Sequence, residues 1–294
     1  MLISTTICHR GLVRDQNEDS CISNEQAQLW LVADGVGGNQ GGKVASEMAV
    51  QTIERRYRQG LSLKEAILEA NRIISEAGQE QDQLRGMATT IVAAGFSGLS
   101  YQLAWLGDSR AYLLSPEDIQ LLSSDHNVAN ALFQRGDISE DELFNHPGQH
   151  ELTQALGLMS LDQVPGIKGS LKENQCLLLC TDGLSGVLTD RQILQSYCRL
   201  DPRNLKTLKQ FANELLRKVL AAGAPDNVSF TLIMPNAPGG HGSSAPAAAE
   251  KPGTEPGRLE QSKNKSVRRR IDKAPITWLL LSVVVLIMLF LFFY

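Results

Sequence analysis

The first part of the chain changes from a strand-like pattern of apolar residues to a helical one. Up to residue 36, apolar and polar residues form short runs typical of β-strands. After residue 42, apolar residues recur every three or four positions, which predicts a helix. A second helix is predicted from Ser62, because Glu65 three residues later completes a capping box. The strand-like runs are LISTTIC (2–8), DSCIS (19–23) and LWLVAD (29–34).

The rest of the first 235 residues contains more predicted strands than helices. Helices are predicted near residues 190–198 and 204–222, and residues 127–157 show signals of short helices and turns. The helices therefore come in two consecutive pairs and do not alternate strictly with strands. This order predicts an α+β fold in which helix pairs pack outside antiparallel sheets. The further strands are MATTIVAAGF (87–96), LSYQLAWLGDSRAYLLS (99–115), NQCLLLCTDG (174–183) and NVSFTLIMP (227–235).

The composition changes after Pro235. Residues 236–275 are rich in Gly, Pro, Ala and Ser and end in a basic run, which indicates a flexible linker. Residues 276–294 carry no charge and are long enough to cross the apolar core of a bilayer. A buried core helix and a removable lipid-anchor signal are the alternatives. We expect one C-terminal transmembrane helix, a single-pass membrane anchor that keeps the domain on the cytoplasmic side.

The charge of the chain limits the molecules that it can bind, and its cysteine content indicates the cellular compartment. Residues 1–235 carry 20 Lys and Arg against 28 Asp and Glu, a net charge near −8. This argues against nucleic acid as a partner, because phosphate backbones bind basic surfaces. The five cysteines include no CxxC pair, and Cys176 and Cys180 flank an apolar run, so buried free thiols are predicted there. The N-terminus lacks a signal-peptide pattern, and we expect a reduced, cytosolic domain.

The run LVADGVGGNQGG (31–42) ends a predicted strand on Asp34 and continues with five glycines. Three explanations are open: an ordinary turn, a phosphate-binding loop, or a strand end that delivers a metal ligand. A phosphate loop requires Ser or Thr directly after its lysine, but Val44 follows Lys43. A metal ligand requires partners elsewhere in the chain.

Four other aspartates lie at the edges of predicted strands, with Gly, Pro or Asn beside them. Each of them alone is more typical of a turn or a cap. Together with Asp34 they form a set of oxygen ligands without matching His or Cys, which favours Mg²⁺ or Mn²⁺ over structural zinc. These residues are Asp19, Asp108, Asp182 and Asp226.

These aspartates lie in blocks that resemble the metal-dependent protein phosphatases, also called protein phosphatase type 2C. The resemblance covers residues 5–235 and is closest to compact bacterial members. It implies a four-layer α-β-β-α sandwich of two antiparallel sheets flanked by helix pairs, in one phosphatase domain over residues 1–235. The blocks, in order, are GLVRDQNEDS, VADGVGG, GGKVASEMA, MATT, LGDSRAY, SDHN, CTDGL and PDNVS.

The resemblance also implies a set of metal ligands. Asp34 matches the carboxylate that bridges two metal ions, and Gly35 matches a ligand that binds through its carbonyl oxygen. Asp182 and Asp226 match the other carboxylates of the pair. Asp108 matches an aspartate that, with Asp182, holds a third ion in bacterial relatives. The implied cofactor is two Mn²⁺ or Mg²⁺ ions, or three where this last site is filled.

Other matched residues surround these ligands. Arg14 matches the arginine that binds the substrate phosphate, and a surface ion pair is its alternative. Glu18 and Asp19 resemble carboxylates that act partly through metal-bound water. Asn227 follows a ligand and is expected to orient it. His126 opens a variable flap, where it contacts substrate or has an ordinary structural role.

The implied activity is hydrolysis of phosphoserine and phosphothreonine in proteins by in-line attack of a water that bridges two ions. Two positions depart from the family pattern. Val36 stands where some members have a histidine proposed to protonate the leaving oxygen, so water or another group must serve. Gly186 stands where an aspartate is common, which weakens any third metal site.

Residues 125–157 fit the flap over the active site of bacterial relatives, with a plain surface insertion as the alternative. The expected partners are phosphorylated proteins, in particular a Ser/Thr kinase and its substrates. We expect the enzyme to be monomeric and to act on them at the membrane. Two other classes stay open: a phosphatase-like binding module without catalysis, and a hydrolase of small phosphoric esters. Such a module should lack a bridging aspartate or the arginine, and both are present.

Overall fold

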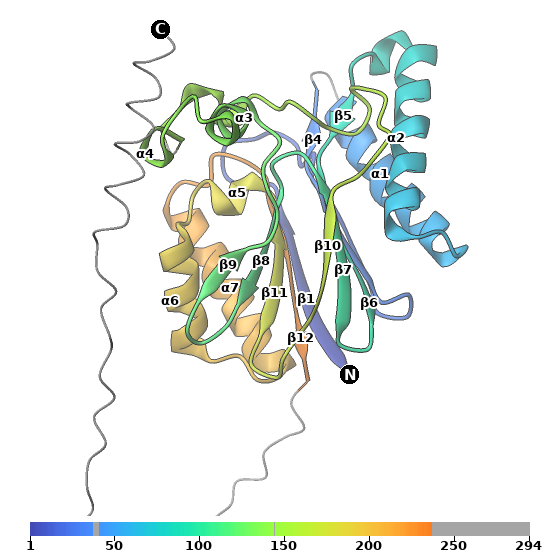
Figure 1. The fold of residues 1–294 in the computed structure, drawn as a ribbon. Coiled ribbons are helices and arrows are strands. Elements are labelled where there is room, and N and C mark those ends of the chain that lie inside the picture. The colour runs from blue at the N-terminus through green and yellow to red at the C-terminus, as the bar shows by residue number, and fades with distance from the viewer. Residues whose placement is uncertain (38–40, 144, 237–294) are drawn as a thin grey trace, which may run out of the picture. The chain divides into compact units, whose positions relative to one another are not determined.

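Two five-stranded antiparallel sheets face each other, with helices outside them (Figure 1). The computed structural model describes residues 1–37, 41–143 and 145–236. The predicted α+β architecture with two antiparallel sheets is confirmed. No helix in these described ranges is long and apolar enough to cross a membrane. The predicted linker, from residue 237 on, and the predicted transmembrane segment at 276–294 lie outside the described residues.

The first sheet has the strand order β1-β12-β11-β8-β9, and the second has the order β10-β7-β6-β3-β2. The strands of the first sheet are β1 (Leu2–His9), β12 (Val228–Pro235), β11 (Cys176–Cys180), β8 (Arg110–Leu114) and β9 (Ile119–Leu121). Those of the second are β10 (Gly166–Ser170), β7 (Ser100–Leu106), β6 (Ile91–Ser97), β3 (Leu29–Ala33) and β2 (Ser20–Asn24). A separate short pair consists of β4 (Gly35–Val36) and β5 (Ala88–Thr89).

Two helix pairs cover the outer faces of the sheets. Helices α1 (Gly41–Arg58) and α2 (Leu63–Glu80) pack on the second sheet, and α6 (Asp190–Leu200) and α7 (Leu205–Ala221) pack on the first. The predicted capping box begins α2: the Ser62 hydroxyl accepts from the Glu65 N–H at 3.3 Å, and the Glu65 carboxylate accepts from the Ser62 N–H at 2.8 Å. The two reciprocal bonds satisfy N–H groups that the helix itself leaves without a partner.

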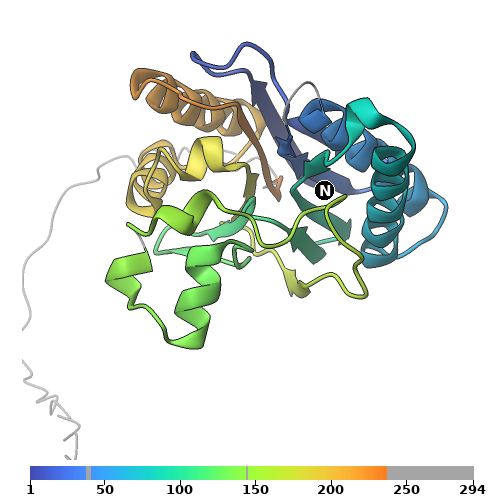
Figure 2. The ribbon, with the colours of Figure 1, turned by 90° about the horizontal axis from the view of Figure 1, so that it is seen from above.

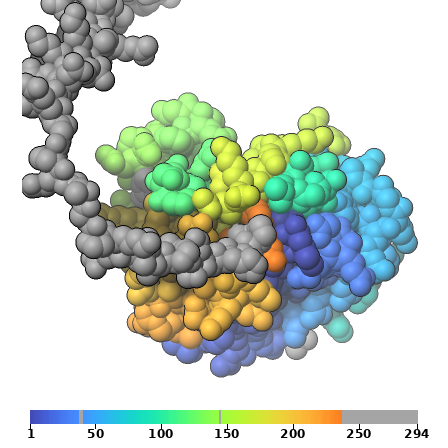
Figure 3. Space-filling model, turned by 90° about the horizontal axis from the view of Figure 1, so that it is seen from below, coloured from blue at the N-terminus to red at the C-terminus, as the bar shows by residue number. Residues whose placement is uncertain are grey.

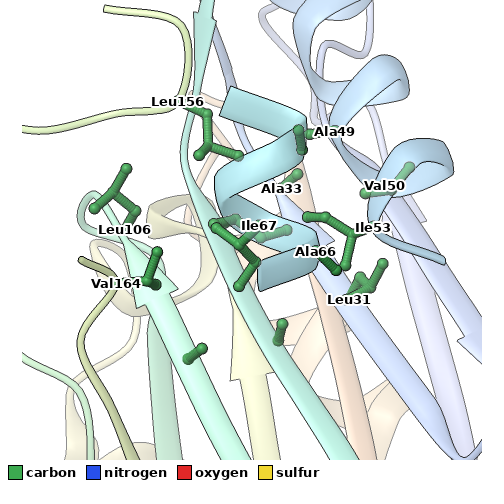
Figure 4. Close-up of a cluster of buried hydrophobic side chains, with 14 of the residues drawn as sticks. Leu31, Ala33, Ala49, Val50, Ile53, Ala66, Ile67, Leu106, Leu156 and Val164 are labelled. Carbon is green, nitrogen blue, oxygen red and sulfur yellow. The ribbon is translucent and has the colours of Figure 1, made fainter. Parts of the chain in front are cut away.

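Alternate residues of the central strands face different layers. In β3, Leu29, Leu31 and Ala33 pack with α1 and α2, whereas Trp30 and Val32 face the other sheet. Figure 4 shows Leu31 and Ala33 within the helix-facing cluster. Because such strands are buried on both faces, their sequences read as continuous apolar runs instead of a strict alternation.

Three short elements were not predicted from the sequence. Strand β10 has the sequence GIKGS, whose two glycines and lysine hide its pairing with the edge of β7. Strand β9 has only three residues, none of them buried. Helix α5 (Asp182–Ser185) is a single turn that begins on one of the predicted ligands. All three owe their form to tertiary contacts rather than to a local apolar period.

The predicted flap region lies at one end of the sandwich, the end that also carries α5, β4 and β5 (Figures 1 and 2). It contains α3 (Val128–Arg135), α4 (Glu140–Leu143) and a 3₁₀ turn (Pro147–His150). Bridges from Asn127 to Leu152 and from Thr89 to Leu156 close its base. The prediction of short helices and turns is therefore confirmed.

The two ends of the described chain lie together at the end of the sandwich opposite the flap region. Strand β1 pairs with β12 from Leu2 opposite Pro235 to His9 opposite Val228. The Asn236 N–H also donates to the Met1 carbonyl at 2.8 Å. Figure 3 views the molecule from this side, where the orange end of β12 adjoins dark-blue N-terminal atoms.

Candidate active site

Five aspartates form one cluster at the end of the sandwich that carries α5. Asp34 follows β3, Asp108 lies between β7 and β8, Asp182 begins α5, Asp226 precedes β12, and Asp19 precedes β2. Burial raises the pKa of Asp34 well above its usual range, and the charges of the other four raise it further. Carboxylates affect one another in this way only at short range. The structure thus brings together the aspartates that the sequence singled out.

Two threonines and a serine fix the backbone at Asp34. The Asp34 carbonyl accepts from the Thr90 N–H at 2.8 Å and from the Thr89 hydroxyl at 2.8 Å. The Asp34 N–H donates to the Thr90 hydroxyl at 3.0 Å, and this hydroxyl lies 2.6 Å from that of Ser109. The three hydroxyl residues, all buried, tie Asp34 to the turn that carries Asp108. The sequence flagged their blocks, MATT and LGDSRAY, but not this linkage.

The carboxyl of Asp19 is buried and held by the residue before Asp182. The Thr181 hydroxyl donates to Asp19 Oδ2 at 3.1 Å, while Asp19 Oδ1 has no hydrogen-bond partner. Burial raises the pKa of Asp19 to about 7, and hydrogen bonds from Ser229 and Thr181 oppose the shift. A buried carboxyl oxygen without a partner costs free energy, so a cation or an ordered water is expected beside it.

Asp182 and Asp108 show the same electrostatic strain. Burial, followed by the charge of Asp226, raises the pKa of Asp182, whose Oδ1 also lacks a hydrogen-bond partner. Burial raises the pKa of Asp108 to about 7, and the charges of Asp182 and Asp125 add to the effect. The resemblance paired Asp108 with Asp182, and the structure brings them within mutual electrostatic reach.

Arg14 lies at the exposed rim of this cluster. One of its terminal nitrogens donates to Asp226 Oδ2 at 2.7 Å. This hydrogen bond and the charge of Asp226, with smaller effects of Asp34 and Glu18, raise the pKa of Arg14. The guanidinium is therefore a permanent cation among carboxylates. Within the described part of the chain it bonds only Asp226, so most of its N–H donors are free to bind an anion.

Asn227 contacts Asp226 through its backbone. The Asn227 N–H donates to the Asp226 carboxylate at 2.7 Å, a bond that suits the predicted orienting role. Its side-chain nitrogen instead donates to the carbonyls of Arg10 and Gln16, at 2.8 and 2.9 Å, and its side-chain oxygen accepts from the Glu18 N–H at 2.8 Å. Asn227 therefore holds the loop that carries Arg14 and the backbone of Glu18.

The glycines after Asp34 have a steric cause of their own. A Cβ on Gly35 would lie 2.2 Å from the Gly42 carbonyl oxygen and 2.6 Å from that of Glu18. A Cβ on Gly42 would lie 2.8 Å from the backbone of Gly35. Two of the glycines thus allow β4 to touch the start of α1, which brings the Gly35 carbonyl, Glu18 and Asp34 into one small region.

His126 anchors the start of the flap region. The ring Nδ1 of His126 accepts from the Gly107 N–H at 3.1 Å. The backbone N–H of His126 donates to the Gly107 carbonyl at 2.9 Å. Burial lowers the pKa of His126, so the neutral ring persists at neutral pH. Next to it, the Arg110 guanidinium and Asp125 form an ion pair with contacts of 2.7 to 3.2 Å. Of the two predicted roles for His126, these bonds favour the structural one.

A family model described as protein phosphatase 2C matches residues 8–223 of the chain. The chain belongs to the protein phosphatase 2C family. This confirms the predicted family and the prediction of a Ser/Thr phosphatase enzyme.

Relatives and solved structures agree with this assignment. The serine/threonine phosphatase stp of Listeria innocua is 31% identical over 240 residues, which cover 77% of this chain and 93% of the relative. The crystal structure of Stp1 from Staphylococcus aureus has a TM-score of 0.73 at 28% identity, over 81% of this chain and 96% of that one. The catalytic domain of PstP, solved in complex with two manganese ions, has a TM-score of 0.69 at 28% identity, over 79% and 97%.

The donor set of this protein phosphatase 2C fits hard divalent cations. No group of three or more His, Cys, Asp or Glu side chains within the described residues is arranged to hold a metal ion as it stands. However, Asp19 and Asp182 each keep a buried oxygen without a partner, and the clustered carboxylates raise one another's pKa. All these donors are oxygens, the ligands that Mg²⁺ and Mn²⁺ prefer. A cation would relieve both the mutual repulsion and the missing bonds.

His150 is a further residue near the site, and no pattern in the sequence indicates its position there. It ends the 3₁₀ turn of the flap region, is highly exposed, and places Nδ1 4.0 Å from Asp182 Oδ2. A separation of more than thirty residues and an irregular segment between them hid this approach from pattern analysis. Its position shows that the flap region reaches the carboxylate cluster.

Proposed function

We propose that this protein phosphatase 2C removes phosphate from phosphoserine and phosphothreonine in proteins, in a reaction that depends on Mn²⁺ or Mg²⁺. The observation that carries the proposal is the cluster of five aspartates at one end of the sandwich, with the Arg14 guanidinium at its rim. The negative cluster would repel a phosphate on its own. It suits a phosphate only together with cations, which invert the local field.

Asp34, Asp182 and Asp226, with the Gly35 carbonyl, would hold the metal pair. When bound, such a pair acts as a Lewis acid toward phosphoryl oxygens and supplies a nucleophile at neutral pH. Asp108 and Asp182 would hold a third ion. Gly186 adds no ligand there, and a Cβ at this position would lie 2.8 Å from the Asp182 carbonyl.

Arg14 would bind the phosphoryl oxygens and stabilise the negative charge that develops on them. The guanidinium offers five donors in a planar fork, of which one now bonds Asp226. Glu18 and Asp19 would act partly through water bound to the metal pair, and the Thr181 hydroxyl, which donates to Asp19 Oδ2, would orient that carboxylate.

Removal of Mn²⁺ and loss of Arg14 are expected to have separable effects. Chelation should abolish hydrolysis of a phosphothreonine peptide by the full chain. Arg14→Ala should lower kcat/KM about a hundredfold, because the charge-assisted bonds to phosphate are lost. Mn²⁺ affinity, measured by calorimetry, should not fall, because the change removes a cation that competes for Asp226.

Arg14→Lys keeps the charge but not the fork and should lie between the wild type and Arg14→Ala. Arg85→Ala removes an arginine paired with Asp82 outside the site and is the matched control. A parallel loss of Mn²⁺ affinity in Arg14→Ala would show that Arg14 supports the ligands and does not bind phosphate. Activity only on small phosphoric esters would favour a small-molecule hydrolase, and no activity would favour a binding module.

We further propose that residues 276–294 anchor the enzyme in the membrane, with the phosphatase domain on the cytoplasmic side. The support is the sequence alone: 19 residues without a charge, preceded by the basic run SKNKSVRRRIDK. A tether would raise the local concentration of membrane-bound targets. The expected targets are a Ser/Thr kinase and that kinase's substrates, dephosphorylated by a monomeric enzyme.

The full chain is expected to sediment with membranes and to resist extraction by high salt and alkaline carbonate. Val284→Lys together with Leu286→Lys should release it, because each lysine at the centre of a membrane helix costs about 2.5–3.5 kcal/mol. The matched control places two lysines at the same spacing in the linker, as Ala247→Lys together with Ala249→Lys. Extraction of the wild type by salt alone would contradict the anchor.

A further inference from the structure

The loop of residues 10–16, between β1 and β2, is closed at its neck by one buried side chain. The Asn227 side-chain nitrogen donates to the carbonyls of Arg10 and Gln16, the two ends of the loop. Both bonds are made by the same amide group, so the ends cannot separate without leaving a buried donor without a partner. Such a donor costs about 1–3 kcal/mol. The loop is therefore held as one unit.

The first half of the loop also lies directly against the residues before β12. The Leu12 N–H donates to the Ala224 carbonyl at 3.0 Å. Gly11 has φ +78°, and a Cβ there would lie 2.0 Å from the Asp226 carbonyl oxygen. Only glycine allows this approach. The backbone that leads to the tip of the loop is thereby fixed against the segment that carries Asp226.

The tip of this fixed loop presents two apolar side chains to solvent. Leu12 is 60% exposed and Val13 is 68% exposed, and in the described part of the chain only Met1 exceeds them among large apolar residues. Burial of one such side chain is worth about 1.5–3 kcal/mol. The clamped backbone prevents the loop from gaining this free energy by folding inward. Leu12 and Val13 are the two residues before Arg14, which lies at the rim of the aspartate cluster.

We propose that Leu12 and Val13 form a contact surface for apolar side chains that flank the phosphorylated residue of the substrate. The proposal rests on the proposed function, in which Arg14 binds the phosphate. Val13 and Leu12 are the first and second residues before Arg14, so their Cα atoms lie within about 8 Å of the Arg14 Cα. Successive residues of an extended peptide advance about 3.3 Å. A phosphopeptide bound at Arg14 therefore places its neighbouring side chains within reach of both. The enzyme selects phosphoproteins with aliphatic or aromatic residues next to the phosphorylated residue.

The test compares three substrates with the full chain in Mn²⁺. They are p-nitrophenyl phosphate, a phosphothreonine peptide with Leu on both sides of the phosphothreonine, and the same peptide with Asn on both sides. The wild type should prefer the Leu peptide to the Asn peptide about tenfold in kcat/KM. In the double variant Leu12→Ser, Val13→Ser this ratio should fall to about one. The ratio of the Leu peptide to p-nitrophenyl phosphate should fall about tenfold as well.

Leu121→Ser, on β9 at the opposite edge of the first sheet from β1, changes an exposed leucine elsewhere and should keep the wild-type preference. A wild type that hydrolyses both peptides equally, or a double variant that keeps the preference, overturns the contact surface and leaves the phosphatase function intact. Failure of the wild type to hydrolyse any of the three substrates would instead overturn the proposed function, and the contact surface with it.

Discussion

Asp182→Asn is expected to lower the Mn²⁺-dependent kcat/KM for a phosphothreonine peptide roughly a thousandfold, or about 4 kcal/mol of transition-state stabilisation. The substitution keeps the shape of the side chain but removes its charge. Asp182 is one of the proposed ligands of the metal pair, and its charge also raises the pKa of Asp108, so its loss would weaken the metal pair and any third ion together. Calorimetry with Mn²⁺ should show weaker binding together with the loss of activity.

Asp190→Asn is a matched control, because Asp190 opens α6 only eight residues later and lies outside the cluster. Its Mn²⁺ binding and kinetics should equal those of the wild type. In the absence of metal, the midpoint temperature of unfolding of Asp182→Asn should not fall below that of the wild type, because the substitution removes a charge that repels the other aspartates. Full activity of Asp182→Asn would place the metal ligands elsewhere and refute the proposed site.

In the metal-free protein, Asp34→Asn is expected to raise stability at pH 8 while destroying the proposed metal site. The folded state raises the pKa of Asp34 well above that of the unfolded chain, mainly through burial. Between pH 4 and the raised pKa, the folded state therefore binds a proton that the unfolded chain releases. Stability falls as pH rises through this range, by about 1.4 kcal/mol for each unit of pKa difference. Asn carries no such charge and avoids the loss.

Thermal unfolding in EDTA at pH 5 and pH 8 measures this effect. The variant should unfold several degrees higher than the wild type at pH 8, and the difference should shrink at pH 5. Mn²⁺ should raise the midpoint of the wild type and leave that of Asp34→Asn nearly unchanged. Asp162→Asn removes an exposed aspartate and should shift neither midpoint. A variant less stable than the wild type at pH 8 would mean that the Asp34 charge is compensated within the metal-free fold.

The main strands, the two helix pairs and the clustered aspartates could be predicted because their signals are local. Asp34, Asp182 and Asp226 each interrupt or border an apolar run, and a carboxylate at a strand end can be recognised without knowing its neighbours. The capping box at Ser62 spans only four residues and was predicted correctly. Strand β10 could not be predicted, because its pairing with β7 and not its own sequence makes it a strand.

The details of the site depend on contacts between residues far apart in the chain. The Asn227 side chain bonds the backbones of Arg10 and Gln16 across more than two hundred residues, which its place beside Asp226 does not reveal. His150 approaches Asp182 only because the flap region folds back over the end of the sandwich. The glycines at 35 and 42 allow contact between two backbone segments, which the run of glycines in the sequence does not reveal.

The pairing of β1 with β12 determines where both ends of the domain lie relative to the aspartate cluster. Strand β12 begins beside Asp226 and runs about 26 Å, given its eight residues, before Asn236 bonds Met1 at the far end. Anything joined to either end of the domain is therefore attached at the end of the sandwich opposite the aspartate cluster. A fusion partner, a surface for immobilisation or a tether joined there would leave the aspartate cluster accessible. Because Met1 and Asn236 are adjacent, a short linker can join them in a circular permutant whose new termini lie elsewhere.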